Sequence, residues 1–364
     1  MRKAVYSFII IGLLLMLYRA FAGLGAVTAL SDYQPWGLVK AVNIFFAATL
    51  AAGSFVVAAA AEVFGARRFR PLVRPVLLMG FICHTFVLIA LLYDVGRPLD
   101  VWRIITNPHG TSALLWTAWT EVAYTSVMVV ELLPEVLHGR AGLVSTIEKV
   151  KVPLVVLSAA LAVVYQSTLG TLFLASPQHI VPAWSGPWLN WLFLLSAVPA
   201  GLGMVVIESS ISGRYGRRSA DPVVLRQAGG MMGVFLVLYM LIRLTDLVIR
   251  GAFTGGSRLG DVWLVTELCV GGLLPLVLLL VKRVRETGAG LVAASALTLL
   301  GVFMNRVGVT IIGWVLPPGA SYFPSALEFI ASAFFIVAAV SLYWYASGRL
   351  ALKAYHLPET QPLD

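Results

Sequence analysis

Apolar residues occur along this chain in ten long runs, and short polar segments separate the runs. A helix needs roughly 20 apolar residues to cross the hydrocarbon core of a bilayer, and each run is about that long. The runs span residues 4–27, 39–64, 75–94, 112–133, 152–173, 188–210, 224–250, 261–281, 289–315 and 324–346. The segments between them are too short to hold a soluble domain. The pattern therefore predicts an all-α polytopic membrane protein with ten transmembrane helices.

The composition supports a membrane protein, and the charges predict its orientation. Of the 364 residues, 59% are hydrophobic and 12% are charged, whereas about a quarter of the residues of soluble domains are charged. The net charge of +9 could indicate a nucleic-acid partner, but most basic residues lie in alternate loops, as cytoplasmic loops require. These basic segments are residues 2–3, 67–74, 140–151, 214–226, 282–285 and 349–353. We therefore expect both the N-terminus and the C-terminus in the cytoplasm and no nucleic-acid partner.

The histidines and cysteines argue against haem and metal in this chain. Only one of the five histidines, His84, falls within an apolar run, whereas two haems held between membrane helices usually need four facing histidines. The two cysteines, Cys83 and Cys269, are far from any spacing that holds zinc or an iron–sulfur cluster. Redox chemistry in this chain would therefore need a mobile, lipid-soluble electron carrier.

Three ionisable residues in the first half of the chain are the main candidates for chemistry: His84, Asp94 and Glu121. Ionisable groups within the hydrocarbon layer cost a few kcal/mol each, so each is a functional candidate. His84 should lie roughly 15 Å below the outer surface and Glu121 roughly 13 Å below it on the next helix, at 1.5 Å per residue. Histidine titrates near neutral pH, so these two groups could share a proton. Asp94 is expected to pair with Arg97 at the mouth of a cavity.

The other charged residues within the runs have two interpretations, buried ion pairs or a path for protons. Arg243 and Asp246 are about one helical turn apart, as expected of an ion pair. The remaining candidates are Glu131, Glu208, Glu267, Arg306 and Glu328. Of these, Glu131 and Glu208 lie near the predicted cytoplasmic ends of their helices, where they could take up protons.

Several motifs together resemble the NrfD/PsrC superfamily of quinone-interacting integral membrane subunits. They are SDYQPWGL (31–38), AAGSFVVAAAAEVFGARRFRPLVRPVLL (51–78), DVGRP (94–98), YQSTLG (165–170), RLTDLVIRG (243–251) and YFPSALEF (322–329). Within the superfamily, the chain is most similar to the ten-helix membrane subunit of periplasmic nickel–iron hydrogenase and its relatives in the Dsr sulfur-metabolism complex. It departs from the hydrogenase pattern at Tyr165, where those proteins carry a histidine, and near Trp116, where they carry a glutamate that Glu121 could replace.

The resemblance implies two four-helix bundles, residues 39–173 and 188–315, and two peripheral parts. The peripheral parts are the first helix with an outer loop, residues 1–38, and the last helix with a cytoplasmic tail, residues 324–364. The first bundle is expected to hold a pocket for menaquinone or ubiquinone near the periplasmic face, with His84 and Asp94 as proton partners. Five further residues are expected to shape this pocket: Tyr33, Gln34, Trp36, Arg97 and Gln166.

The function implied is that of a membrane subunit of a respiratory redox complex in the inner membrane of a bacterium or archaeon. Electrons are expected to pass between the quinone and a periplasmic ferredoxin-like iron–sulfur subunit. That subunit would connect to a catalytic module, a hydrogenase or another reductase, and protons would be taken up or released. Two other interpretations stay open: a passive membrane anchor without quinone chemistry, and a secondary transporter, which two similar bundles with midplane charges would also fit.

Overall fold

The computed structural model describes residues 2–136, 141–216 and 220–349. Within these ranges, ten helical segments are long and apolar enough to cross a membrane, which confirms the number predicted from the sequence. The spans are Lys3–Ala22, Leu38–Glu62, Arg67–Asp94, Ala113–Pro134, Lys151–Leu174, Leu189–Arg214, Pro222–Arg250, Arg258–Leu280, Gly288–Ile312 and Ala326–Arg349. No β-strand occurs within the described ranges. The predicted cytoplasmic tail, after residue 349, lies outside them.

Most spans are built on one long α-helix. These helices are α1 (Arg2–Ala22), α5 (Arg70–Asp94), α7 (Ala113–Val136), α9 (Lys151–Leu174), α10 (Leu189–Arg214), α11 (Pro222–Arg250) and α16 (Ala326–Arg349). Short helices also lie in the connections: α6 (Arg103–Thr106), α8 (Ala141–Lys149) and α14 (Lys282–Glu286).

Three spans contain a π-helical segment, a wider turn that often occurs at functional sites. The second span consists of α2 (Leu38–Lys40), a π segment (Ala41–Phe46), α3 (Ala47–Ala51) and α4 (Gly53–Glu62). The eighth consists of α12 (Arg258–Leu268), a π segment (Cys269–Leu273) and α13 (Leu274–Leu280). The ninth is α15 (Gly288–Val307) followed by a π segment (Gly308–Ile312).

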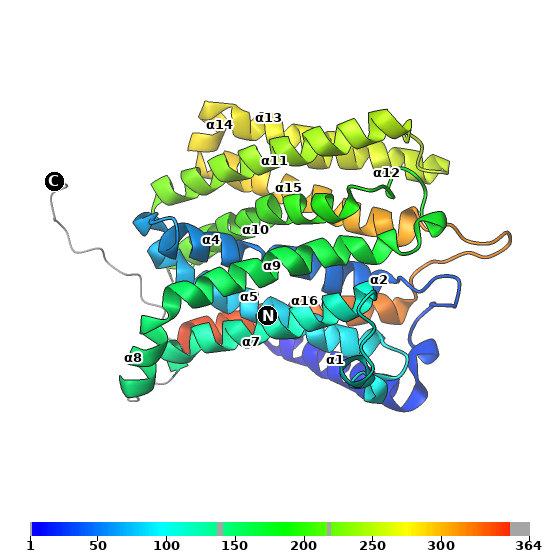
Figure 1. Cartoon of the computed structure of the whole chain (residues 1–364), viewed down its shortest axis with the longest axis horizontal. Helices are drawn as coiled ribbons and strands as arrows, with labels where there is room; N and C mark the ends of the chain where they lie inside the picture. Colours follow the sequence, from blue (N-terminus) through cyan, green and yellow to red (C-terminus); the bar gives the residue numbers. More distant parts are fainter. Residues whose placement is uncertain (1, 137–140, 217–219, 350–364) are drawn as a thin grey trace.

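Helix α10 lies at the centre of the protein (Figure 1). It packs against α3, α4 and α9 on the one hand and against α11 and α15 on the other. In the first half of the chain, α4 contacts α5, α5 contacts α7, α7 contacts α9, and α9 contacts α4. Helix α1 contacts α16, which in turn contacts α5. The grouping into two bundles and the cytoplasmic placement of the termini stay predictions.

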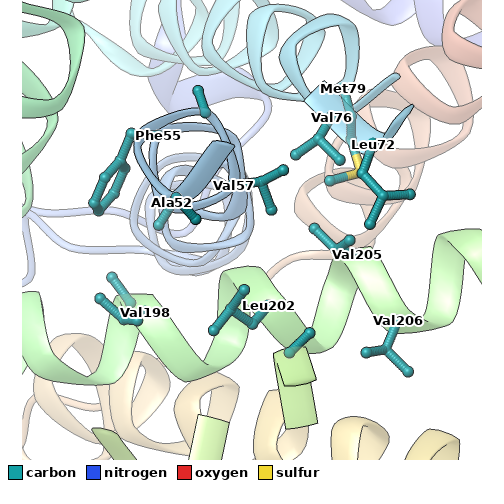
Figure 2. Close-up of a cluster of buried hydrophobic side chains, with 14 of the residues drawn as sticks. Ala52, Phe55, Val57, Leu72, Val76, Met79, Val198, Leu202, Val205 and Val206 are labelled. Atoms are coloured by element: carbon teal, nitrogen blue, oxygen red, sulfur yellow. The ribbon is translucent and has the colours of Figure 1, made fainter. Parts of the chain in front are cut away.

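The two halves of the chain meet where α4 crosses α10. Buried aliphatic side chains of α4, α5 and α10 interlock there, among them Val57, Val76, Leu202 and Val205 (Figure 2). At the crossing, Gly53 and Gly201 bring the two backbones into contact: a Cβ on Gly201 would lie 2.1 Å from the Gly53 nitrogen. Small residues allow such close approach between membrane helices. This contact fixes the position of the second span, which carries part of the site described next.

Candidate functional site

A cavity of about 320 Å³ lies among the helices of the first half of the chain. Its walls come from the second span, α5, α7, α9 and the loop that precedes α2. Most wall side chains are apolar, among them Ile44, Phe45, Val87, Leu91 and Leu169. A mostly apolar cavity with a few polar groups is typical of a small-molecule site.

The polar groups of the cavity lie mainly at two ends. We call Glu121 and Tyr165 the deep end, and Lys40 and Asp94 the loop end, because the second pair lies beside the loop that follows α5. His84, which contacts Glu121, and Asp94 are ten residues apart on α5. At a rise of 1.5 Å per residue, these two positions are roughly 15 Å apart along the helix axis.

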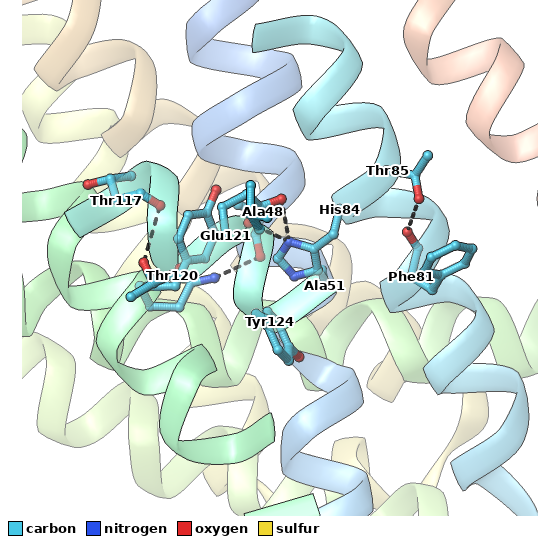
Figure 3. A network of polar contacts seen from close by, with 12 residues as sticks. Ala48, Ala51, Phe81, His84, Thr85, Thr117, Thr120, Glu121 and Tyr124 are labelled. Atoms are coloured by element: carbon cyan, nitrogen blue, oxygen red, sulfur yellow. Dashed lines mark hydrogen bonds and ion pairs between the residues drawn. The ribbon is translucent and has the colours of Figure 1, made fainter. Parts of the chain in front are cut away.

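At the deep end, the carboxylate of Glu121 is bonded to His84. The imidazole Nδ1 lies 2.9 Å from Oε2 and 3.1 Å from Oε1 (Figure 3). His84 is 0% exposed and does not line the cavity, whereas Glu121 does. The rings of Tyr124 and Tyr165 pack against the imidazole, with centroids 4.7 and 5.6 Å away. His84 therefore stands behind Glu121, and the carboxyl group is what a ligand in the cavity would contact.

At the loop end, Asp94 forms an ion pair with Lys40. Helix α5 ends at Asp94, so its last carbonyl groups lack partners within the helix. Arg19 supplies a partner for one of them, because its guanidinium donates to the carbonyl oxygen of Tyr93 at 2.6 Å, and it also donates to the carbonyl of Val95, the residue that follows the helix. A cation at a helix C-terminus also interacts favourably with the helix dipole. Arg19 thus holds the end of α5 that presents Asp94 to the cavity.

Of the residues expected to shape the pocket, Trp36 lines the cavity and four others do not. Gln34 is buried, and its amide donates to the carbonyl oxygens of Trp36 and Thr310. Gln166 is buried and donates to the Ala48 carbonyl at 2.8 Å, which ties α9 to α3. The side chains of the other two, Tyr33 and Arg97, are exposed. The expected pair of Asp94 with Arg97 is therefore replaced by the pair with Lys40.

Three charged residues of the second half, Arg243, Glu267 and Arg306, form a separate buried cluster. The Glu267 carboxylate accepts from Trp184 Nε1 at 2.7 Å and Asn305 Nδ2 at 2.9 Å, and Arg243 lies 3.4 Å away. Arg306 donates to the Asn305 side chain at 2.7 Å. The cavity beside Glu267 measures only about 10 Å³, which is room for about one water molecule. This cluster has no space for a quinone.

The remaining candidates also have protein partners. Asp246 pairs with Arg250 rather than with Arg243. Glu208 accepts hydrogen bonds from Ser212 at 2.6 Å and Tyr343 at 2.7 Å. Glu131 accepts one from Ser158 at 3.3 Å and lines a second cavity of about 50 Å³.

Glu328 binds the loop that precedes α2. Its carboxylate accepts from the backbone N–H groups of Ala29, at 2.7 Å, and Leu38, at 3.3 Å, and from the Tyr322 hydroxyl, at 2.5 Å. Burial and the hydrogen bond to Glu328 raise the pKa of Tyr322 far above its ordinary value, so this hydroxyl stays a donor.

The structure shows no group of three histidine, cysteine, aspartate or glutamate side chains placed to hold a metal ion, among the residues it describes. The expected lack of haem and metal stays a prediction.

Comparison with known proteins identifies the family. Residues 26–318 match the family model described as polysulphide reductase, NrfD. The chain belongs to the NrfD family. This region includes both ends of the cavity and the cluster around Glu267.

Relatives of this NrfD-family chain are subunits of a hydrogenase and of reductases. The probable Ni/Fe-hydrogenase 2 b-type cytochrome subunit of Escherichia coli is 28% identical over 92% of this chain and 88% of the relative. The integral membrane subunit of menaquinone reductase from Nitratidesulfovibrio vulgaris is 26% identical over 94% of this chain and 87% of the relative. One of the subunits of selenate reductase from Mesobacillus selenatarsenatis is 24% identical over 86% and 82%. The protein is thus a multi-pass integral membrane protein of the NrfD family.

Two residues near the loop end were not predicted from the sequence to have a role there: Lys40, which lines the cavity, and Arg19, which binds the end of α5. Both lie in or at the start of an apolar run, where a lysine or arginine usually reaches toward the lipid interface. The sequence signal that could have identified Arg19 was its position within an apolar run, because a charged residue inside the membrane is a functional candidate. In the structure Arg19 is 5% exposed.

Proposed function

We propose that this protein is the quinone-binding membrane subunit of a respiratory redox complex, and that menaquinone or ubiquinone binds in the 320 Å³ cavity. One observation carries the proposal: the cavity is apolar along its walls and has a buried carboxyl group at each end, Glu121 and Asp94. A quinone has apolar ring faces and two oxygens on opposite edges, so an apolar cavity with a polar group toward either end has the polarity that this ligand requires. The name of the menaquinone reductase relative supports the same chemistry.

Converting a quinone to a quinol takes two electrons and two protons, so the site needs groups that hold and move protons. Glu121 exchanges one proton with the quinone oxygen at the deep end, and His84 shares that proton through its Nδ1. Asp94 serves the oxygen at the loop end. In this assignment His84 acts through Glu121 and does not touch the quinone, because Glu121 stands between the imidazole and the cavity.

The electrons come from, or go to, an iron–sulfur partner subunit of ferredoxin type, which docks on the predicted periplasmic face and connects to a hydrogenase or another reductase. Three rings support this position: the exposed His179 stacks on Trp314 at 5.7 Å between centroids, and Trp314 lies 6.4 Å from Trp36, which lines the cavity. The named relatives are themselves subunits of hydrogenase or reductase complexes.

The test is to replace each carboxyl group with the amide of the same shape in the purified complex. We expect Glu121→Gln and Asp94→Asn each to lower quinone-linked turnover by about 100-fold or more, the usual contribution of a general acid or base. Thr125→Val is the matched control for Glu121, because Thr125 is also buried on α7, one turn further along, and does not line the cavity. Normal turnover of both amide variants in an assembled complex would contradict the proposal and would favour a passive anchor.

Two residues, Glu131 and Glu208, are candidates for proton uptake from the cytoplasm, and Glu131 is the better one. The supporting observation is its place in the wall of the 50 Å³ cavity, whereas Glu208 is held by Ser212 and Tyr343. Under this proposal Glu131→Gln lowers the number of protons taken from the cytoplasmic side for each electron transferred in sealed vesicles. An unchanged ratio would count against it.

A further inference from the structure

Lys40 is the one cation among the described residues that line the cavity. It ends the short helix α2, directly before the π segment Ala41–Phe46. Its side chain is 16% exposed and pairs with Asp94, whose side chain is 1% exposed. The π segment that begins after Lys40 also places Ile44 and Phe45 in the cavity wall. The local structure thus directs a basic residue at a membrane-span terminus into the cavity.

The hydrogen bonds of Lys40 leave its ammonium group able to take a further acceptor. Besides the ion pair, the ammonium group donates to the Pro35 carbonyl at 2.9 Å and to the Asp94 carbonyl at 3.4 Å. An ammonium group has three N–H donors, and the longest of these contacts is a weak one. Exchanging it for an acceptor in the cavity costs little, and the four-carbon stem of lysine allows the movement.

A quinone presents such an acceptor. As electrons reach the ring, negative charge develops on its oxygens, and a fixed cation in a water-poor site stabilises that charge more than it stabilises the neutral carbonyl. Neither carboxylate of the cavity can do this, because Glu121 and Asp94 carry negative charge when ionised. No other described side chain in the cavity wall is cationic.

We propose that Lys40 is a quinone-binding residue, which donates a hydrogen bond to the quinone oxygen at the loop end while it remains paired with Asp94. This inference rests on the proposed function. It assigns the two quinone oxygens to different partners: Lys40 with Asp94 at one end, and Glu121 backed by His84 at the other. Asp94 then lies beside the same oxygen and can exchange the proton that Lys40 does not release.

A rival role for Lys40 is to neutralise Asp94 and tie α2 to α5. The two roles differ once the carboxylate is removed. If Lys40 only neutralises Asp94, replacing Lys40 in an Asp94→Asn background should not change the binding affinity. If Lys40 binds the quinone, the same replacement should still weaken binding. A double-mutant comparison separates the two, because interacting residues give non-additive effects.

The experiment measures binding of 2-heptyl-4-hydroxyquinoline N-oxide, a quinol analogue, by fluorescence quenching in the purified full-length chain or complex. We expect Lys40→Met to weaken binding roughly 10-fold to 100-fold relative to the same protein with Lys40, both proteins carrying Asp94→Asn, because a hydrogen bond to a charged group contributes that much. The Asp94→Asn background also avoids a buried carboxylate left without its partner. Arg103→Met, which removes a cation on the same face outside the cavity, should leave binding unchanged.

Equal affinity with and without Lys40 in the Asp94→Asn background would overturn the proposal. If the Lys40→Met protein with Asp94→Asn does not accumulate, Lys40→Gln in the same background leaves two amides that can bond to each other, and the same comparison applies.

The proposed function is tested separately. If Asp94→Asn and Glu121→Gln both turn over quinone normally, the proposed function fails; if they are impaired while Lys40 contributes nothing to binding, only the assignment of Lys40 fails.

Discussion

The imidazole Nδ1 of His84 lies 2.9 Å from Oε2 of Glu121, and the two side chains come from different helices, α5 and α7. Both are buried, and only Glu121 lines the cavity. An imidazole and a carboxylate in contact can hold one proton between them. In the proposed function, Glu121 is the group that meets the quinone, and His84 is the group that orients Glu121 and shares its proton.

We therefore predict that His84 affects turnover more than binding. His84→Leu and His84→Gln should lower quinone-linked turnover by about 100-fold, while the affinity for the N-oxide analogue changes by less than about threefold, because His84 does not line the cavity. Turnover and fluorescence titration on the same preparations measure the two effects. Thr85→Val is the neighbouring control, since its hydroxyl only bonds to Phe81 of its own helix. A loss of affinity as large as the loss of turnover would place His84 in contact with the quinone instead.

The contact between His84 and Glu121 could be anticipated from the sequence, and the loop end could not. A helix rises 1.5 Å per residue, so distance from the helix end gives depth, and two polar groups at equal depth on consecutive helices tend to meet. The ten spans were predictable for a similar reason, since the bilayer fixes their length.

The partner of Asp94 depended on tertiary structure. The motif around Asp94 suggested a pair with Arg97, but Arg97 is exposed and Asp94 pairs with Lys40, 54 residues earlier in the chain. That pair depends on how the loop before α2 folds back over the end of α5. No local pattern carries this information, because the contacts that hold the loop come from Glu328 and Tyr322.

The contact between Gly53 and Gly201 should contribute strongly to the stability of the fold. A Cβ at position 201 would lie 2.1 Å from the Gly53 nitrogen, so Gly201→Val forces α4 and α10 apart and disturbs the aliphatic core around them (Figure 2). Overpacking of this kind costs about 1–3 kcal/mol or more. We expect a lower melting temperature in detergent and less protein in the membrane. Gly230→Ala on α11 is the control, because nothing lies within 4 Å of a Cβ there; equal stability of the two variants would contradict the close crossing.

The cluster around Glu267 should stabilise the fold without taking part in quinone binding. Glu267→Gln removes the carboxylate that faces Arg243 and accepts from Trp184 and Asn305. Breaking a buried pair by neutralising one partner costs about 3–5 kcal/mol, so thermal stability should fall clearly. Affinity for the N-oxide analogue should stay unchanged in the protein that remains folded. Glu286→Gln is the comparison, since Glu286 pairs with Lys282 at the surface at 3.9 Å and such pairs contribute about 1 kcal/mol at most.

Glu328 should control the cavity from outside it. Its carboxylate holds the backbone N–H groups of Ala29 and Leu38, which lie on either side of the loop that places Trp36 in the cavity wall. Glu328→Gln weakens hydrogen bonds to a charged acceptor, each of which contributes about 1.5–3 kcal/mol, so the loop loosens and affinity for the N-oxide analogue falls. Tyr322→Phe removes one donor to the same carboxylate and the hydroxyl that accepts from the Leu38 N–H at 3.0 Å, but it keeps both backbone contacts of Glu328, so its effect on affinity should be smaller. Fluorescence titration of the two variants checks this order, and a larger effect of Tyr322→Phe than of Glu328→Gln would show that the tyrosine, rather than the carboxylate, holds the loop.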